Sequence, residues 1–166
     1  LRNVADAIDI DGVVNAIKLA NDTLISAGTT RPRIGVAALN PHAGDDGNFG
    51  TEEIDILAPA IEKARGMQID VDGPWPSDTV FLRGRDGKLD AVVTMYHDQG
   101  QIAMKMMGFD RGVTIAAGLP VPVATPAHGT AFDIAGKGVA NLNATRKAFD
   151  ILCRMGLNFR RSRMAA

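Results

Sequence analysis

The sequence predicts an α/β fold with a largely parallel sheet, and three observations carry this prediction. Short apolar runs that suit buried strands alternate with amphipathic segments that suit helices. Hydrophobic residues make up 46% of the 166 residues and charged residues 22%, which is ordinary for a globular protein and excludes intrinsic disorder. Glycine is frequent, at 18 residues, and marks tight loops between the segments. Ligands of such sheets bind at the carboxyl ends of the strands, so functional residues are expected there.

The first half of the chain predicts two helices that alternate with two strands. Asp9 or Asp11 can cap the first helix, and Gly28 stops it. The second helix begins at Thr51, and Pro59 is expected to kink or shorten it. The expected helices run over about 9–27 and 51–66, the strands over 33–39 and 68–71, and a polar loop over 40–50.

The second half predicts further strands and helices after a turn that Pro74 and Pro76 make. Ser77 or Asp78 can cap a short helix that follows this turn. The expected strands run over 89–96, 112–117 and 121–124, the helices over 101–107 and 143–154, and loops over 97–100 and 128–141. Proline and glycine interrupt the uncharged stretch 112–132, which argues against a membrane helix.

Charge and cysteine content exclude several classes of protein. Eighteen basic residues face 19 acidic ones, a net charge of −1, so no nucleic acid or anionic membrane is expected as a partner. The single Cys153 can form no intrachain disulfide and no Cys-rich zinc site. A reducing compartment, the cytoplasm, is therefore the expected location.

Two histidines follow two of the expected strands. His42 comes after the strand that ends near Leu39, and His97 comes directly after the strand that ends at Tyr96. Neutral imidazoles are good ligands for zinc and other divalent ions, and polar neighbours such as Asp98 suit a site. The alternative is that both are ordinary surface or hydrogen-bonded loop residues. Two ligands do not complete a site, because a catalytic zinc typically takes three from the protein.

Lys105 lies among apolar neighbours, in the run Met104-Lys105-Met106-Met107. Its stem can cover the core while the ammonium group stays in water. Alternatively, a partly desolvated lysine can hold an anionic substrate or move a proton. Both interpretations remain open from the residues alone.

The glycine-rich segment from His128 to Asn141 is neither a dinucleotide fingerprint of the Gly-x-Gly-x-x-Gly type nor a P-loop. Its glycines by themselves mark only a tight loop. The exposed backbone N–H groups of such a loop can nevertheless hold a phosphate or an adenine edge.

Several motifs together resemble a known family. The segment that starts His128-Gly129-Thr130-Ala131 resembles the adenosine-binding loop of metal-dependent β-decarboxylating dehydrogenases such as isocitrate and isopropylmalate dehydrogenase. Four earlier motifs resemble the 4-hydroxythreonine-4-phosphate dehydrogenase family of pyridoxal phosphate biosynthesis: Leu39-Asn40-Pro41-His42-Ala43-Gly44, Gly50-Thr51-Glu52-Glu53, Asp72-Gly73-Pro74 and Tyr96-His97-Asp98-Gln99-Gly100. The resemblance covers residues 1–155, with the same order and spacing of motifs.

The resemblance implies a three-layer α/β sandwich like that of isocitrate and isopropylmalate dehydrogenase. It implies that residues 1–166 are the C-terminal part of a larger two-domain chain whose N-terminal half is absent. It also implies a homodimer whose subunits share the active site. In such a site His42 and His97 would bind a divalent metal (zinc, magnesium, cobalt or manganese), and a third histidine would fall just before Leu1.

The resemblance also assigns roles to further residues. Lys105 would contact the substrate and take part in catalysis, and Asp98 would be a base or a partner that orients His97, although a turn-capping role for Asp98 is equally compatible. The implied contacts to NAD or NADP come from one loop: His128, Gly129, Thr130, Ala131 and Asn141. The implied reaction is oxidation of a secondary alcohol followed by decarboxylation of the resulting β-keto acid.

Two positions depart from the family pattern. The family's next substrate contacts, an Asn and an Arg, fall by spacing on Thr114 and Val123. Loss of an Arg removes a bidentate anion clamp. The substrate is then 4-phosphohydroxy-L-threonine or, in a paralogue, threonate or erythronate 4-phosphate or an aromatic dihydrodiol carboxylate. A non-catalytic binding module and a fragment that is inactive by itself are the remaining alternatives.

Overall fold

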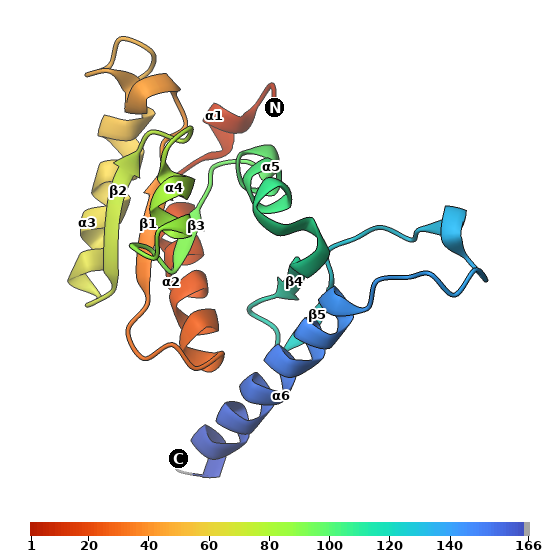
Figure 1. Cartoon of the computed structure of the whole chain (residues 1–166). Coiled ribbons are helices and arrows are strands. Elements are labelled where there is room, and N and C mark those ends of the chain that lie inside the picture. The colour runs from red at the N-terminus through yellow and green to blue at the C-terminus, as the bar shows by residue number, and fades with distance from the viewer. Residues whose placement is uncertain (165–166) are drawn as a thin grey trace. The chain divides into compact units, whose positions relative to one another are not determined.

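A computed structural model describes residues 1–164, and the chain divides into two compact units. The first unit comprises residues 1–25 and 29–103, and the second comprises residues 26–28 and the chain from Met104 onward. Helices and strands alternate in the first unit, as the sequence predicts (Figure 1). None of the helices in the described part of the chain is long and apolar enough to cross a membrane.

The first unit is built on a parallel sheet of three strands with the order β2-β1-β3. The central strand β1 (Arg33–Ala37) pairs in parallel with β2 (Asp70–Trp75) on one side and with β3 (Ala91–Val93) on the other. All of β1 after Arg33 is buried. The carboxyl ends of β1 and β3 therefore lie at the same edge of the sheet.

Helices supply the rest of the apolar core of the first unit. The long helix α2 (Ile10–Ser26) follows the short α1 (Val4–Ala7), and α3 (Ala58–Gly66) runs alongside β2 (Figure 1). Asp9 caps α2, because its Oδ1 accepts a hydrogen bond from the Gly12 backbone N–H at 2.6 Å. The core cluster includes Ile17 of α2, Ile34 and Val36 of β1, Leu57, and Ile61 of α3.

The second unit contains an antiparallel hairpin and a long helix. Strand β4 (Val113–Ala116) pairs with β5 (Val123–Pro126), and α6 (Asn143–Met164) packs against both strands. The side-chain amide of Asn158 donates a hydrogen bond to the Ser26 carbonyl at 2.9 Å, which ties residues 26–28 to this unit. Two short 3-10 turns, Phe109–Arg111 (η3) and Phe132–Ile134 (η4), complete it.

The structure corrects two predicted turns. Strand β2 continues through Pro74 to Trp75, where a turn was expected, because the Trp75 carbonyl accepts a hydrogen bond from Ala38 N–H at 2.8 Å and keeps the pairing with β1. Helix α4 (Val80–Arg85) begins after Thr79 and not after Ser77 or Asp78. The backbone N–H groups of Thr79 and Val80 both bond to the Pro76 carbonyl, so a tight turn occupies the expected cap.

Three further element boundaries differ from the prediction. Helix α5 (His97–Gly108) begins at His97, where a loop was expected, and β3 ends at Val93. The α-helical part of the helix expected over 51–66 is shortened, as predicted from Pro59: α3 begins at Ala58, directly before the proline. The π-helical turn Glu53–Leu57 (η2) precedes it. Helix α6 extends to Met164, well beyond the predicted end at Arg154.

Candidate functional site

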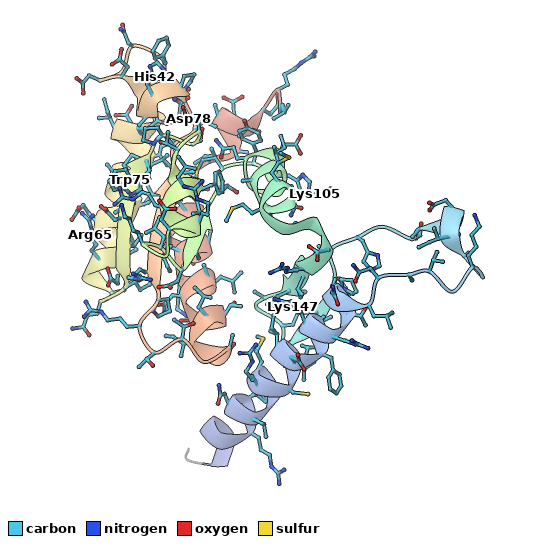
Figure 2. All side chains as sticks on the ribbon, in the orientation of Figure 1. His42, Arg65, Trp75, Asp78, Lys105 and Lys147 are labelled. Carbon is cyan, nitrogen blue, oxygen red and sulfur yellow. The ribbon has the colours of Figure 1, made fainter. Side chains whose placement is uncertain are left out.

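His42 lies on a turn that directly follows β1, at the carboxyl edge of the sheet (Figure 2). The 3-10 turn Pro41–Gly44 (η1) places His42 and Ala43 in the left-handed region, with φ of 54° and 56°. The imidazole ring meets the Phe49 ring edge to face, with 5.8 Å between centroids. Non-glycine residues in this region are strained by about 1 kcal/mol or more each, so the surrounding structure must hold the turn.

A buried carboxylate holds the backbone just before this turn. Glu53, only 3% exposed, accepts hydrogen bonds through Oε1 from the backbone N–H groups of Leu39 and Asn40, both at 2.8 Å. Its Oε2 accepts a third bond from the Asn40 side-chain amide at 2.9 Å. In the sequence Glu53 stands out only as the last residue of the Gly50-Thr51-Glu52-Glu53 motif, and no local pattern marks it as buried.

His97 begins α5, and Asp98 holds one of its two ring nitrogens. The Nδ1–H of His97 donates to Asp98 Oδ1 at 2.7 Å. In the neutral ring this leaves Nε2 with a free lone pair, the arrangement in which a carboxylate orients a metal-binding histidine. The His97 side chain is 74% exposed, so Nε2 is open to a ligand.

Gln99 joins the two strand ends that carry the histidines. Its side-chain amide donates to the Ala38 carbonyl, just after β1, at 2.9 Å. Its Oε1 accepts a hydrogen bond from Met95 N–H, just after β3, at 2.8 Å. One side chain therefore links the segments that lead to His42 and His97. Within the described residues no group of three or more His, Cys, Asp or Glu side chains is placed to hold a metal.

A cavity of about 310 Å³ lies beside the His97–Asp98 pair. Asp98, Gln99 and Tyr96 line it from the segment that follows β3. Ser77 and Asp78 line it from the turn before α4. It therefore offers two carboxylates, two hydroxyls and an amide within the first unit, beside the apolar side chains of Phe81, Ile102 and Ala103.

A second cavity, of about 270 Å³, lies within the second unit. Three residues of the predicted cofactor loop line it, His128, Ala131 and Asn141, and Gly129 and Thr130 belong to the same loop. The His128 Nδ1–H donates to the Gly129 carbonyl at 2.9 Å, which fixes the ring on its own loop. The lining also includes Ile134 and Ala140 of the same glycine-rich segment, and Asp110 and Ala144 outside it.

The predicted substrate residues also lie in this second unit. Thr114 of β4 and Val123 of β5 point to the same face of the hairpin, because Ala116, two residues after Thr114, pairs directly with Val123. Both side chains are exposed. Lys105 is exposed on α5 (Figure 2).

A parallel sheet with histidines past two strand ends, and a cavity under a glycine-rich loop, are typical of α/β proteins that bind small molecules. Within that class a family model decides the assignment. The chain belongs to the family of the pyridoxal phosphate biosynthetic protein PdxA, whose model matches residues 1–152.

Individual relatives agree with this assignment. The 4-hydroxythreonine-4-phosphate dehydrogenase of Beijerinckia indica subsp. indica is 51% identical over 156 residues, 92% of this chain and 46% of the relative. The D-threonate 4-phosphate dehydrogenase of Salmonella typhimurium is 51% identical over 140 residues, 84% of this chain and 43% of the relative. The chain therefore spans about half the length of the curated relatives it matches.

A solved structure shows the same fold. The crystal structure of 4-hydroxythreonine-4-phosphate dehydrogenase from Klebsiella pneumoniae matches with a TM-score of 0.75 and 44% identity. The match covers 96% of this chain and 46% of that one. The α/β fold that the sequence predicts is thereby confirmed.

Proposed function

We propose that this chain is part of a dehydrogenase that uses a divalent metal and NAD or NADP to oxidise, and then decarboxylate, a phosphorylated hydroxy acid. One observation carries the proposal. His42 and His97 follow the neighbouring parallel strands β1 and β3, and Gln99 bonds to the backbone after each strand. Two imidazoles at one sheet edge are the beginning of a metal site.

The chemistry of the donors fits a divalent metal. His97 has Nδ1 engaged by Asp98 and Nε2 free, and His42 lies on a turn whose backbone Glu53 holds. The described residues offer no group of three candidate ligands, and a third ligand would come from outside them, as the family resemblance implies. When bound, zinc, magnesium, cobalt or manganese would act as a Lewis acid on the substrate oxygens.

The cavity under the His128–Asn141 loop fits the adenosine part of NAD or NADP. It combines an apolar wall of alanines and Ile134 with polar groups on His128 and Asn141. A nucleoside needs both kinds of surface, a flat apolar wall for the base and a few polar groups at its edge. When bound, the dinucleotide would accept the hydride, and this chain would supply its placement.

The reaction needs two steps that this chain's residues can assist. The alcohol would lose its hydroxyl proton and its carbinol hydride, and the dinucleotide held by the His128–Asn141 loop would supply the hydride acceptor. The β-keto acid formed then loses CO₂, and the enolate that remains takes up a proton. Lys105 would hold the substrate anion or supply that proton, and Asp98 would keep the His97 ring oriented.

The substrate is 4-phosphohydroxy-L-threonine or a related acid. Thr114 and Val123 lie on one exposed hairpin face, where the family pattern has an amide and a guanidinium. A relative named for 4-hydroxythreonine 4-phosphate and one named for D-threonate 4-phosphate are each 51% identical to this chain, although over 156 and 140 residues. The exchange to Val123 favours a paralogue specific for threonate or erythronate 4-phosphate or for an aromatic dihydrodiol carboxylate.

The deciding experiment follows NADH or NADPH formation at 340 nm by the full-length protein that contains this chain. Each candidate acid is added with and without Mg²⁺, Zn²⁺, Co²⁺ or Mn²⁺ after treatment with a chelator. We expect turnover with one phosphorylated hydroxy acid, its loss on chelation and its return with metal. Absence of turnover with every acid and metal, in protein that still binds NAD, would favour a non-catalytic binding module.

A homodimer with a shared active site and a cytoplasmic location complete the proposal. The homodimer rests on the family resemblance, and the location rests on the single cysteine of the sequence. Sedimentation of the full-length protein tests the dimer. Mixed dimers, made from two subunits that are each inactive through a different substitution, test whether the site is shared.

A further inference from the structure

We propose that Glu53 is the positioning residue that sets the geometry of His42 for metal binding; this role rests on the proposed function. Glu53 is the one charged side chain found buried in the described part of the chain, at 3% exposure. A buried carboxylate is costly unless donors satisfy it. The donors that satisfy it here belong to the segment that leads to His42.

The hydrogen bonds of Glu53 fix the backbone before His42. Its Oε1 receives two consecutive backbone N–H groups, those of Leu39 and Asn40, and its Oε2 receives the Asn40 side chain. These residues fill the gap between the end of β1 at Ala37 and the start of the His42 turn at Pro41. Hydrogen bonds to a charged acceptor are about twice as strong as neutral ones, so this segment is held firmly.

The same carboxylate also contacts the backbone after His42. A Cβ atom built on Gly44 would lie 2.7 Å from Glu53 Oε2, so the glycine backbone lies directly against the carboxylate. Gly44 also has a φ of +85°, which disfavours any side chain. Glu53 therefore touches the turn on both sides of His42, two and three residues before it and two residues after it.

This arrangement suits a ligand-bearing turn more than a packing role. His42 and Ala43 have left-handed φ angles, which persist only where neighbours enforce them. The hydrogen bonds of Glu53 go to the loop at the carboxyl edge of the sheet, which carries His42 and determines the orientation of its imidazole ring.

The test compares Co²⁺ binding by the full-length protein and three variants. Glu53→Gln keeps the size of the side chain but replaces an acceptor with a donor that faces the Asn40 amide. We expect the dissociation constant for Co²⁺, measured against a competing chelator, to rise about 10- to 100-fold, as when other partners of metal ligands are removed. The visible absorption bands of bound Co²⁺ should also shift, and affinity for NAD should stay unchanged.

Glu62→Gln is the matched control, because Glu62 is an exposed carboxylate of α3 with only a surface ion pair to Arg65. It should bind Co²⁺ like the wild type. If Glu53 only stabilises the fold, Glu53→Gln will lower the melting temperature and leave Co²⁺ binding unchanged. A Glu53→Gln protein whose Co²⁺ affinity is within about twofold of wild type, with an unchanged spectrum, therefore overturns the positioning role.

Two further results separate this inference from the proposed function. His42→Ala must weaken Co²⁺ binding; if it does not, the proposed metal site fails and the role of Glu53 with it. Co²⁺ binding that requires His42 but not Glu53 overturns the positioning role alone. Should Glu53→Gln not fold, Asn40→Ala removes the side-chain bonds to Oε2 of Glu53 and to Oε2 of Glu52, and Glu52→Ala removes the second bond alone. A Co²⁺ affinity that is no weaker in Asn40→Ala than in Glu52→Ala overturns the role.

Discussion

The His97–Asp98 pair shows how a neighbouring residue can select one nitrogen of an imidazole. Asp98 accepts the hydrogen bond from Nδ1 at 2.7 Å, and both side chains are mostly exposed, at 74% and 64%. The pair therefore contributes little to the stability of the fold, since exposed pairs are generally worth less than about 1 kcal/mol. Its value lies in the orientation of the ring.

Replacement of His97 by alanine tests whether this histidine is needed for activity but not for the stability of the fold. We expect His97→Ala in the full-length protein to abolish turnover and to leave the thermal melting curve unchanged, because the lost side chain is exposed and outside the core. NADH formation and circular dichroism melting measure the two effects. Near-normal turnover in this variant would contradict metal ligation by His97.

At the level of elements, an ion pair joins β1 to the segment before β3 at the amino edge of the sheet. Asp90 accepts three hydrogen bonds from Arg33, one from the backbone N–H at 2.8 Å and two from the guanidinium at 2.9 and 3.0 Å. These bonds hold the pKa of Asp90 below its usual value, and the same pairing raises the pKa of Arg33.

The lowered pKa of Asp90 predicts how stability depends on pH. A carboxyl whose pKa is lower in the folded protein stabilises it above the unfolded pKa, about 3.9, and this contribution is lost as the pH falls through the folded value. We expect Asp90→Asn to lower the melting temperature by a few degrees near pH 7. The difference from wild type should shrink below about pH 4. A difference that stays constant down to pH 2 would contradict the assignment.

The sequence predicts a helix or strand well where a local pattern determines its boundaries. It predicts them less well where a contact with a distant residue determines them. The apolar face of α2 and the Asp9 cap are local, and both are confirmed. The continuation of β2 to Trp75 depends on a hydrogen bond from Ala38, far away in the sequence. The start of α5 at His97 has no local signal either, because glycine and polar residues follow it.

The same distinction applies to the candidate site. Histidines past strand ends are visible in the sequence, as is the glycine-rich loop. The burial of Glu53 is not, because its donors lie 13 and 14 residues earlier in the chain. The bridging role of Gln99 depends on the Ala38 carbonyl, 61 residues away. Such contacts join residues that only the folded chain brings together, and sequence spacing does not reveal them.

At the scale of the whole molecule, the second unit leaves several large apolar side chains uncovered. Met106, Phe132 and Phe149 are 84%, 83% and 67% exposed. Apolar side chains that form one contiguous exposed patch can bind another protein surface, and we expect these three to be covered in the full-length protein. The proposed homodimer and the greater length of the relatives both offer such surfaces.

We therefore expect the 166-residue chain, when expressed alone, to associate with itself in a concentration-dependent way. The apolar side chains of the second unit would leave water by contact between copies. Light scattering over a dilution series measures the association, and the full-length protein is the control that should give one defined size. A monodisperse monomer at all concentrations would contradict this expectation.

The pleat of the β4–β5 hairpin has a consequence for how such proteins diverge. Thr114 and Val123 share its exposed face, while the alternate residues Val113, Ile115 and Ala124 are partly buried on the side away from them. An exchange at either exposed position leaves the hidden packing untouched. If the proposed substrate role of Thr114 and Val123 holds, an exchange at either position would change the preferred acid without a penalty in thermal tolerance.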